Sequence, residues 1–177
     1  MKQHYSAYFA HLVILLLVLT LVKGLYDFSF ISLWLGGLAG IIMADLDQLI
    51  YVYFLHPEDP ISIQARGYIS RRKIISAWTS LVATKRERKN LIFHTTHFYL
   101  FFLALTFFIL TSTASLFGHG LVIGFILHLL TDQIRDFREK GNLDSWFDKL
   151  GIEVDGDKIK IYLLANVIFL LIIGLLF

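Results

Sequence analysis

The sequence has no cysteine, only two prolines and few charged residues for its length. Without cysteine, disulfide bonds and thiolate metal sites are excluded. Only 17% of the 177 residues are charged, whereas a soluble domain carries about 25%. Hydrophobic residues make up 56% instead, and the mean hydropathy is +0.67. This composition is typical of a polytopic membrane protein, and the length predicts one membrane domain over residues 1–177.

Five stretches are apolar enough to span a membrane, since a spanning helix needs about 20 mostly apolar residues. We expect helices because lipid offers no partner for the backbone groups of an open strand. The first stretch resembles a signal peptide, but no small-x-small cleavage site follows its apolar core, which favours a span. The predicted fold class is therefore all-α, a polytopic membrane helical bundle. The five predicted spans cover residues 5–26, 28–55, 91–113, 115–137 and 159–177.

Basic residues are distributed unevenly along the chain. All 16 Lys and Arg residues except Lys23 lie at the amino terminus or in two polar stretches, 56–90 and 135–160. By the positive-inside rule, these regions face the cytoplasm and the carboxyl terminus lies outside. The expected location is the cytoplasmic (inner) membrane, as a multi-pass protein with a cytoplasmic amino terminus.

The larger polar stretch contains a helical pattern over residues 68–90. Ile74, Trp78, Leu81 and Val82 fall on one face, and basic clusters flank them. Two interpretations fit this pattern: a helix lying in the membrane interface against anionic lipid, or a solvated cytoplasmic helix packed on the bundle. Membrane lipids are the expected partners, with anionic lipids as candidates. No nucleic-acid partner is expected, and no oligomeric state is predicted. The candidate residues for headgroup binding are Arg71, Arg72, Lys73, Lys85 and Arg86.

Two small-xxx-small pairs occur inside the predicted spans. Gly36 and Gly40 form one pair, and Gly120 and Gly124 form the other. Such pairs let two helix backbones approach closely. We expect close helix packing at both pairs.

Ionisable residues inside membrane spans are costly and are functional candidates by default. With the predicted topology and a rise of 1.5 Å per residue, these residues share one depth, roughly 5–15 Å from the cytoplasmic ends of their helices. Four helices therefore contribute polar groups to one layer of the cytoplasmic half. The members of this layer are His11, Asp45, Asp47, His94, His97, His128 and Asp132.

The spacing of these residues predicts which of them share a helix face. His128 and Asp132 are four apart, and His94 and His97 are three apart, so each pair lies on one face. Asp45 and Asp47 differ by about 200° around a regular helix. We expect both to face the site only if the second helix is interrupted there, which is tolerated where a helix lines a cavity.

Neutral imidazoles and carboxylates are ligands of divalent metals. We expect a metal site, with zinc as the leading candidate and manganese or iron as alternatives. A two-metal site would need bridging carboxylates, whereas a single metal would leave a carboxylate, here Asp47, to act as the general base. Two further interpretations remain open: a structural polar network and a proton or ion pathway.

The order of these motifs resembles the family of membrane-bound metal-dependent hydrolases of the bacterial and archaeal inner membrane. That family has an early His, then Asp-x-Asp-His, His-Arg-x-x-Thr-His and Gly-x-x-x-His-x-x-x-Asp. This chain has His11, "ADLDQ" at 44–48, "HTTH" at 94–97 and "GFILHLLTD" at 124–132. The resemblance implies metal ligands or their neighbours at His11, Asp45, Asp47, His97, His128 and Asp132.

The chain departs from the family pattern at three points. Gln48 stands where the family has a His, and Ile92 stands where it has the first His of the third motif. We expect His94 to take the place of that missing His from one turn away. No Arg follows His94. The resemblance implies hydrolysis of an ester or phosphoester, and the depth of the site predicts a lipid or lipid-linked substrate reached from the cytoplasmic side. The alternatives are a non-catalytic membrane protein with a structural metal or polar cluster, and a small proton or metal transporter.

Overall fold

The computed structural model describes residues 2–84, 91–112, 114–151 and 154–176, and the regular structure within these ranges is helical throughout. The all-α prediction is therefore confirmed. Lys85 and Arg86, two of the predicted headgroup residues, lie outside the described ranges.

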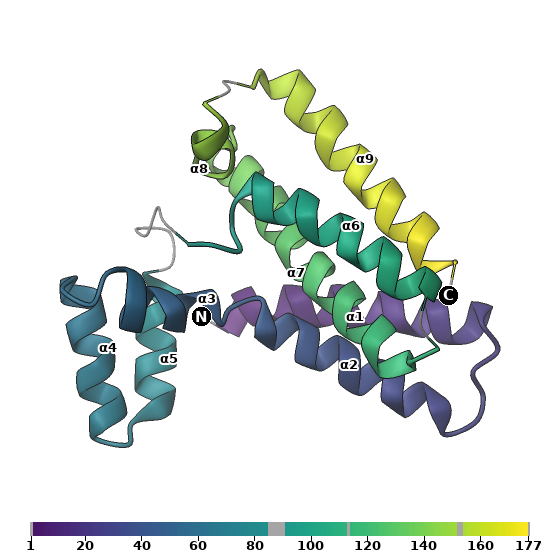
Figure 1. Ribbon diagram of the computed structural model, residues 1–177, viewed down its shortest axis with the longest axis horizontal. Helices are drawn as coiled ribbons and strands as arrows, with labels where there is room; N and C mark the ends of the chain where they lie inside the picture. The colour runs from purple at the N-terminus through teal and green to yellow at the C-terminus, as the bar shows by residue number, and fades with distance from the viewer. Residues whose placement is uncertain (1, 85–90, 113, 152–153, 177) are drawn as a thin grey trace.

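The long helices form a layered bundle (Figure 1). Helices α1 (Lys2–Val22) and α2 (Ser29–Met43) run antiparallel, and α7 (Leu116–Lys140) packs most closely on α2. Helices α6 (Thr96–Ser112) and α9 (Gly156–Gly174) cover α7 on the side away from α2 (Figure 1). The amino terminus lies at one end of the bundle and the carboxyl terminus at the other, as an odd number of crossings requires (Figure 1).

The ends of α7 and α9 follow from local side-chain and backbone chemistry. Ser115 accepts a hydrogen bond from the Gly118 N–H at the start of α7, and Asp155 accepts one from the Gly156 N–H at the start of α9. Such caps satisfy backbone donors that have no partner inside the helix. Helix α7 ends at Gly141, whose φ of 75° lies in the left-handed region that glycine adopts readily.

The contact between α2 and α7 is made by glycine, as the two small-xxx-small pairs predict. A Cβ added at Gly36 or Gly40 would overlap the α7 backbone at Phe117 or Leu121. A Cβ added at Gly120 or Gly124 would overlap the α2 backbone, at Leu33 and at Gly37 respectively. The two backbones therefore touch directly, which fixes the position of Asp45 on the α2 side relative to His128 on α7.

The polar stretch after the second predicted span folds as a hairpin of two helices, α4 (Pro60–Ser70) and α5 (Ile74–Ala83). The predicted amphipathic helix is therefore present only as α5, and its expected extension back to residue 68 is wrong; residues 85–90 lie outside the described ranges. The chain turns at Arg71–Lys73, where Arg72 has a positive φ of 57° that a continuous helix cannot contain. The buried residues of α5 are Ala77 and Leu81, whereas Ile74, expected on the same face, is 68% exposed.

Two described helical stretches, Ser29–Leu55 and Leu116–Lys140, are long and apolar enough to cross a membrane, and the second is mostly buried inside the protein. The apolar helices Ser6–Val22 and Thr96–Ser112 are shorter. A buried helix of a soluble protein meets the same criteria, so length and hydropathy alone do not show a membrane location.

Candidate metal centre

The site begins where the second predicted span loses regular helical geometry. Helix α2 ends at Met43, and α3 (Asp47–Ile50) begins after three residues. Two of these, Asp45 and Leu46, donate their N–H groups in an i→i−3 pattern, as from Asp45 N to Ile42 O. A π-helical turn, Tyr51–Leu55, follows. Tight and wide turns of this kind occur often at functional sites. The expected interruption near Asp45 and Asp47 is thus present, and both side chains are buried.

Asp45 faces α7. Its Oδ1 lies 3.5 Å from Nε2 of His128, which is fully buried. Gln48, one turn further along, donates a hydrogen bond of 2.8 Å from its amide to the same Oδ1. Gln48 therefore orients the Asp45 carboxylate toward His128, which is a positioning role that an amide can perform without binding metal.

His94 connects Asp47 to Asp132. Its Nδ1 lies 2.7 Å from Asp47 Oδ2, and its Nε2 lies 2.9 Å from Asp132 Oδ2. Asp47 Oδ2 also accepts the Phe93 N–H at 3.2 Å. An ionised carboxylate only accepts. In the tautomer suited to metal binding, Nδ1 therefore donates to Asp47, and Nε2 faces Asp132 and the interior of the site. Asp47 thus contacts the His94 nitrogen that points away from the interior of the site. The general base expected from the sequence at Asp47 would instead have to face that interior.

Four groups converge around the Nε2 atoms of the two histidines. One ligand atom each from Asp45, His94 and His128 lies within 4.8 Å of the others, and Asp132 Oδ2 lies 3.4 Å from His128 Nε2. Two ligands of a tetrahedral zinc ion are about 3.3–3.4 Å apart, given bonds of about 2.0–2.1 Å. The separations at His128, 3.5 Å to Asp45 and 3.4 Å to Asp132, are close to this value. His94 Nε2 and Asp132 Oδ2 are closer, at 2.9 Å, so the three residues best spaced for a metal are Asp45, His94 and His128. Asp45, His94 and His128, with Asp132 beside them, are called the metal group below. This group can hold a divalent metal, and its neutral imidazoles and carboxylates suit zinc, manganese or iron.

The carboxylate–histidine contact behind the group also fits a metal site. Metal-bound histidines commonly donate their other ring N–H to a carboxylate, which fixes the ring orientation and strengthens the ligand. Asp47 stands in this relation to His94. Asp47 is accordingly placed to support a ligand and not to serve as one.

Three residues that the sequence did not single out complete the surroundings. The Tyr8 hydroxyl donates to Asp132 Oδ1 and accepts from Arg135, and the Tyr8 ring stacks on His128 at 4.6 Å between centroids. Arg135 Nη2 donates to Asp132 Oδ1 at 2.6 Å. Trp146, from the short helix α8 (Asp144–Phe147), lies 5.5 Å from the His94 ring and covers it.

Two predicted ligands lie outside this group. His97 is exposed on α6, because the chain enters that helix only at Thr96 and His94 occupies the turn before it. His11 is exposed beside α7, with Nδ1 3.5 Å from the Thr131 hydroxyl. The structure therefore brings together Asp45, Asp47, His94, His128 and Asp132, but not His11 and His97.

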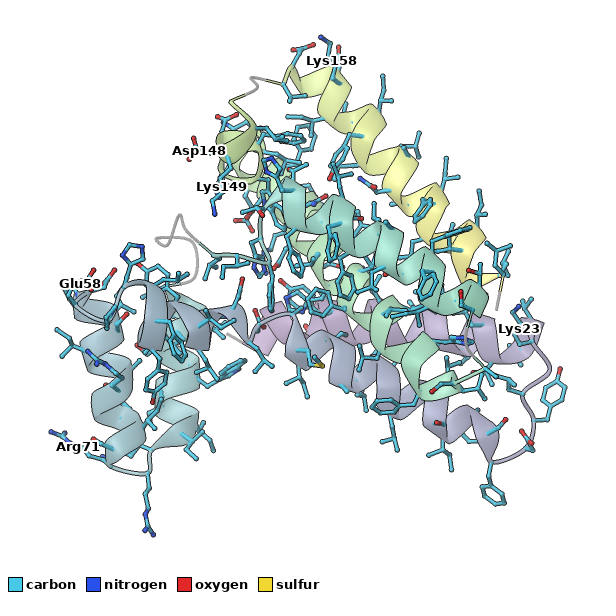
Figure 2. All side chains as sticks on the ribbon, viewed as in Figure 1. Lys23, Glu58, Arg71, Asp148, Lys149 and Lys158 are labelled. Atoms are coloured by element: carbon cyan, nitrogen blue, oxygen red, sulfur yellow. The ribbon has the colours of Figure 1, made fainter. Side chains whose placement is uncertain are left out.

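The predicted headgroup residues of the hairpin lie at a distance from the metal group. Arg71 projects from the far tip of the α4–α5 hairpin, away from the bundle (Figure 2). Arg72 and Lys73 belong to the same turn. These three residues therefore do not lie above the site, and the nearest described basic side chain is Arg135 on α7.

No family model, curated protein or solved structure matches this chain at a significant level. The resemblance of its motifs to membrane-bound metal-dependent hydrolases thus stays a prediction from the sequence, and the geometry of the site carries the functional argument.

Proposed function

We propose that this protein is a membrane-embedded, metal-dependent hydrolase that acts on a lipid or lipid-linked ester or phosphoester from the cytoplasmic side. The observation that carries the proposal is the convergence of Asp45, His94 and His128, with Asp132 beside them, in a buried group. A divalent metal in this group would act as a Lewis acid and lower the pKa of a bound water, which is how such sites cleave esters at neutral pH.

In this proposal the surrounding residues act by positioning. Gln48 holds Asp45, Asp47 holds His94, and Arg135 holds Asp132. The Tyr8 hydroxyl also positions Asp132, because it donates to the Asp132 carboxylate and accepts from Arg135. Groups held in place in this way help a reaction because they need no reorganisation while it proceeds.

The exposed surface supports the membrane location. Large apolar side chains are exposed along α1, α2, α6 and α9. Extensive exposed apolar surface marks a site of interaction with a membrane or another protein. Helix α3, which begins at Asp47, lies at the end of the bundle that also holds the amino terminus and the base of the hairpin (Figure 1). A bilayer around the long helices would cover the apolar surface and leave this end at the cytoplasmic interface. Examples of the exposed residues are Ile14, Leu21, Leu35, Phe101, Phe108, Ile161, Ile168 and Leu171.

A second candidate is a non-catalytic polar cluster that only joins helices. The observation favouring it is that His94 contacts carboxylates through both ring nitrogens, at 2.7 and 2.9 Å, while Arg135 pairs with Asp132. If His94 is doubly protonated, it donates to both carboxylates without a metal. The two candidates differ in whether a metal is bound and whether a bond is cleaved.

Metal content of the purified full chain separates them first. We expect stoichiometric zinc, manganese or iron by elemental analysis, and loss of most of it in His128→Ala and in Asp45→Ala. His97→Ala is the matched control, because His97 is exposed and only three residues from His94. The His97→Ala variant should keep its metal. The metal-loaded protein should then release product from phospholipids or phosphoesters, and His128→Ala should not.

Each result has a defined meaning. A wild-type protein without metal, or His128→Ala with unchanged metal content, contradicts the proposed function and supports the polar cluster. Bound metal without turnover on a broad phospholipid and phosphoester panel supports a structural metal.

A further inference from the structure

An apolar cavity of about 640 Å³ opens beside the metal group. Its walls come from α1, α2 and α5, and Asp45 and Tyr8 are among its lining residues. The volume lies within the range of about 300–1,000 Å³ typical of small-molecule sites. Three wall residues are also exposed on the outer surface, which gives the cavity an opening toward the proposed bilayer: Phe9, Leu38 and Ile42. Ile41 and Trp78 complete its apolar lining.

A second cavity, of about 390 Å³, lies on the other side of Tyr8 between α1 and α7. Its charged or titratable lining residues are mostly basic, since His11, Arg135 and Arg138 stand against one carboxylate, Glu139. The apolar residues Ala7 and Ile134 form much of the remaining wall. Tyr8 lines both cavities. An apolar space and a basic space thus flank one side chain whose hydroxyl bonds to Asp132 of the metal group.

We propose that the two cavities bind one anionic phospholipid, with an acyl chain in the apolar cavity and the charged headgroup at His11, Arg135 and Arg138. This inference rests on the proposed function in treating the metal group as the reaction centre, and it names the substrate class. The ester region of the lipid lies beside Tyr8, next to Asp45 and Asp132.

The chemistry of the two linings argues for this occupant. An acyl chain is favoured in the first cavity because its burial between Ile41, Leu38 and Trp78 removes apolar surface from water. A phosphate is favoured in the second because guanidinium groups hold phosphate oxygens through paired, charge-assisted hydrogen bonds. Only an amphiphile with a negative headgroup matches both linings at once. The second cavity also gives His11 a role in binding the headgroup, whereas His11 has no place in the metal group.

The test is native mass spectrometry of the full chain in mixed detergent micelles with equimolar dioleoyl phosphatidylglycerol and dioleoyl phosphatidylcholine. Chelator is present throughout, so that binding is read without turnover. Leu38→Trp fills the apolar cavity, and Leu35→Trp places the same ring three residues earlier on an exposed position of α2. Arg138→Gln removes one positive charge from the basic cavity and keeps the helix.

We expect wild type and Leu35→Trp to retain one phosphatidylglycerol per chain, and Leu38→Trp to bind it about tenfold more weakly. Arg138→Gln should lower the preference for phosphatidylglycerol over phosphatidylcholine by about fivefold, as expected for one interfacial arginine. Equal binding by Leu38→Trp and Leu35→Trp, or an unchanged preference in Arg138→Gln, overturns the inference.

The outcome is distinguishable from failure of the proposed function. Lipid retention with this pattern but no hydrolysis by metal-loaded protein leaves the lipid site standing and rejects the hydrolase. Hydrolysis of a small soluble phosphoester without selective lipid retention supports the hydrolase and rejects the lipid site.

Discussion

At the scale of single residues, Asp47 provides the sharpest test of how the metal group is built. Asp47→Asn keeps the shape of the side chain but replaces the ionised acceptor behind His94 Nδ1. We expect metal affinity to fall by about 10–100-fold, the usual effect of losing such a supporting partner, without loss of the site. Competition with a chromogenic chelator measures the affinity.

The control for this prediction is Asp148→Asn, which removes an exposed carboxylate outside the site. Its metal affinity should equal that of wild type. If Asp47→Asn abolishes binding altogether, as Asp45→Ala is expected to do, then Asp47 is a ligand and not a supporting residue. Unchanged affinity would remove Asp47 from the metal site.

The sequence predicted some members of the site and not others, for physical reasons. Asp45, Asp47, His94, His128 and Asp132 stand out because charge and imidazole are costly inside an apolar run. Tyr8, Arg135 and Trp146 do not stand out, since aromatic and basic residues are common at membrane interfaces. His94 and His97 could not be separated by spacing, because the choice depends on where α6 begins.

At the scale of helices, the glycine contact between α2 and α7 sets the separation of Asp45 and His128. Gly124→Ala places a methyl group against the α2 backbone at Gly37. We expect a loss of about 1–3 kcal/mol in unfolding free energy, since overpacking displaces neighbours that cannot move independently. Metal affinity should fall as well, because the two helices separate. Thermal unfolding in detergent and metal titration provide the two readouts.

Gly67→Ala is the matched control on α4. A Cβ at this position meets nothing within 4 Å, so alanine should stabilise the helix by roughly 0.5–1 kcal/mol. Equal stability of Gly124→Ala and wild type would show that α2 and α7 pack less closely than described.

Helix positions could be predicted better than helix ends and turns. Apolar runs gave the approximate places of α1, α2, α6, α7 and α9, because length and hydropathy dominate there. The hairpin turn at Arg71–Lys73 could not be predicted from hydrophobic periodicity, since the break contains neither Gly nor Pro. The turn before α6 was also missed, so the predicted span from residue 91 begins five residues before the helix.

At the scale of the whole molecule, the absence of cysteine makes the predicted topology directly measurable. Single cysteines at Tyr26, which is 78% exposed between α1 and α2, and at Arg71 on the hairpin tip sample the two sides. In intact cells a membrane-impermeant maleimide should label Tyr26→Cys only, and Arg71→Cys should react after permeabilisation. The wild-type chain, which has no cysteine, is the control for background labelling.

Labelling of Arg71→Cys in intact cells would invert the topology and place the metal group on the outer side. Labelling of neither variant before permeabilisation, with both reacting afterwards, would contradict membrane insertion with an exposed α1–α2 connection.

The glycine contact also determines how this protein tolerates genetic change. Every amino acid other than glycine carries a Cβ, so every missense change at Gly36, Gly40, Gly120 or Gly124 introduces the atom that the α2–α7 contact excludes. At the metal group, by contrast, exchanges such as Asp to Glu or His to Gln keep a donor in place. Deep mutational scanning should therefore find the least tolerance for substitution at four residues that bind nothing and have no side chain.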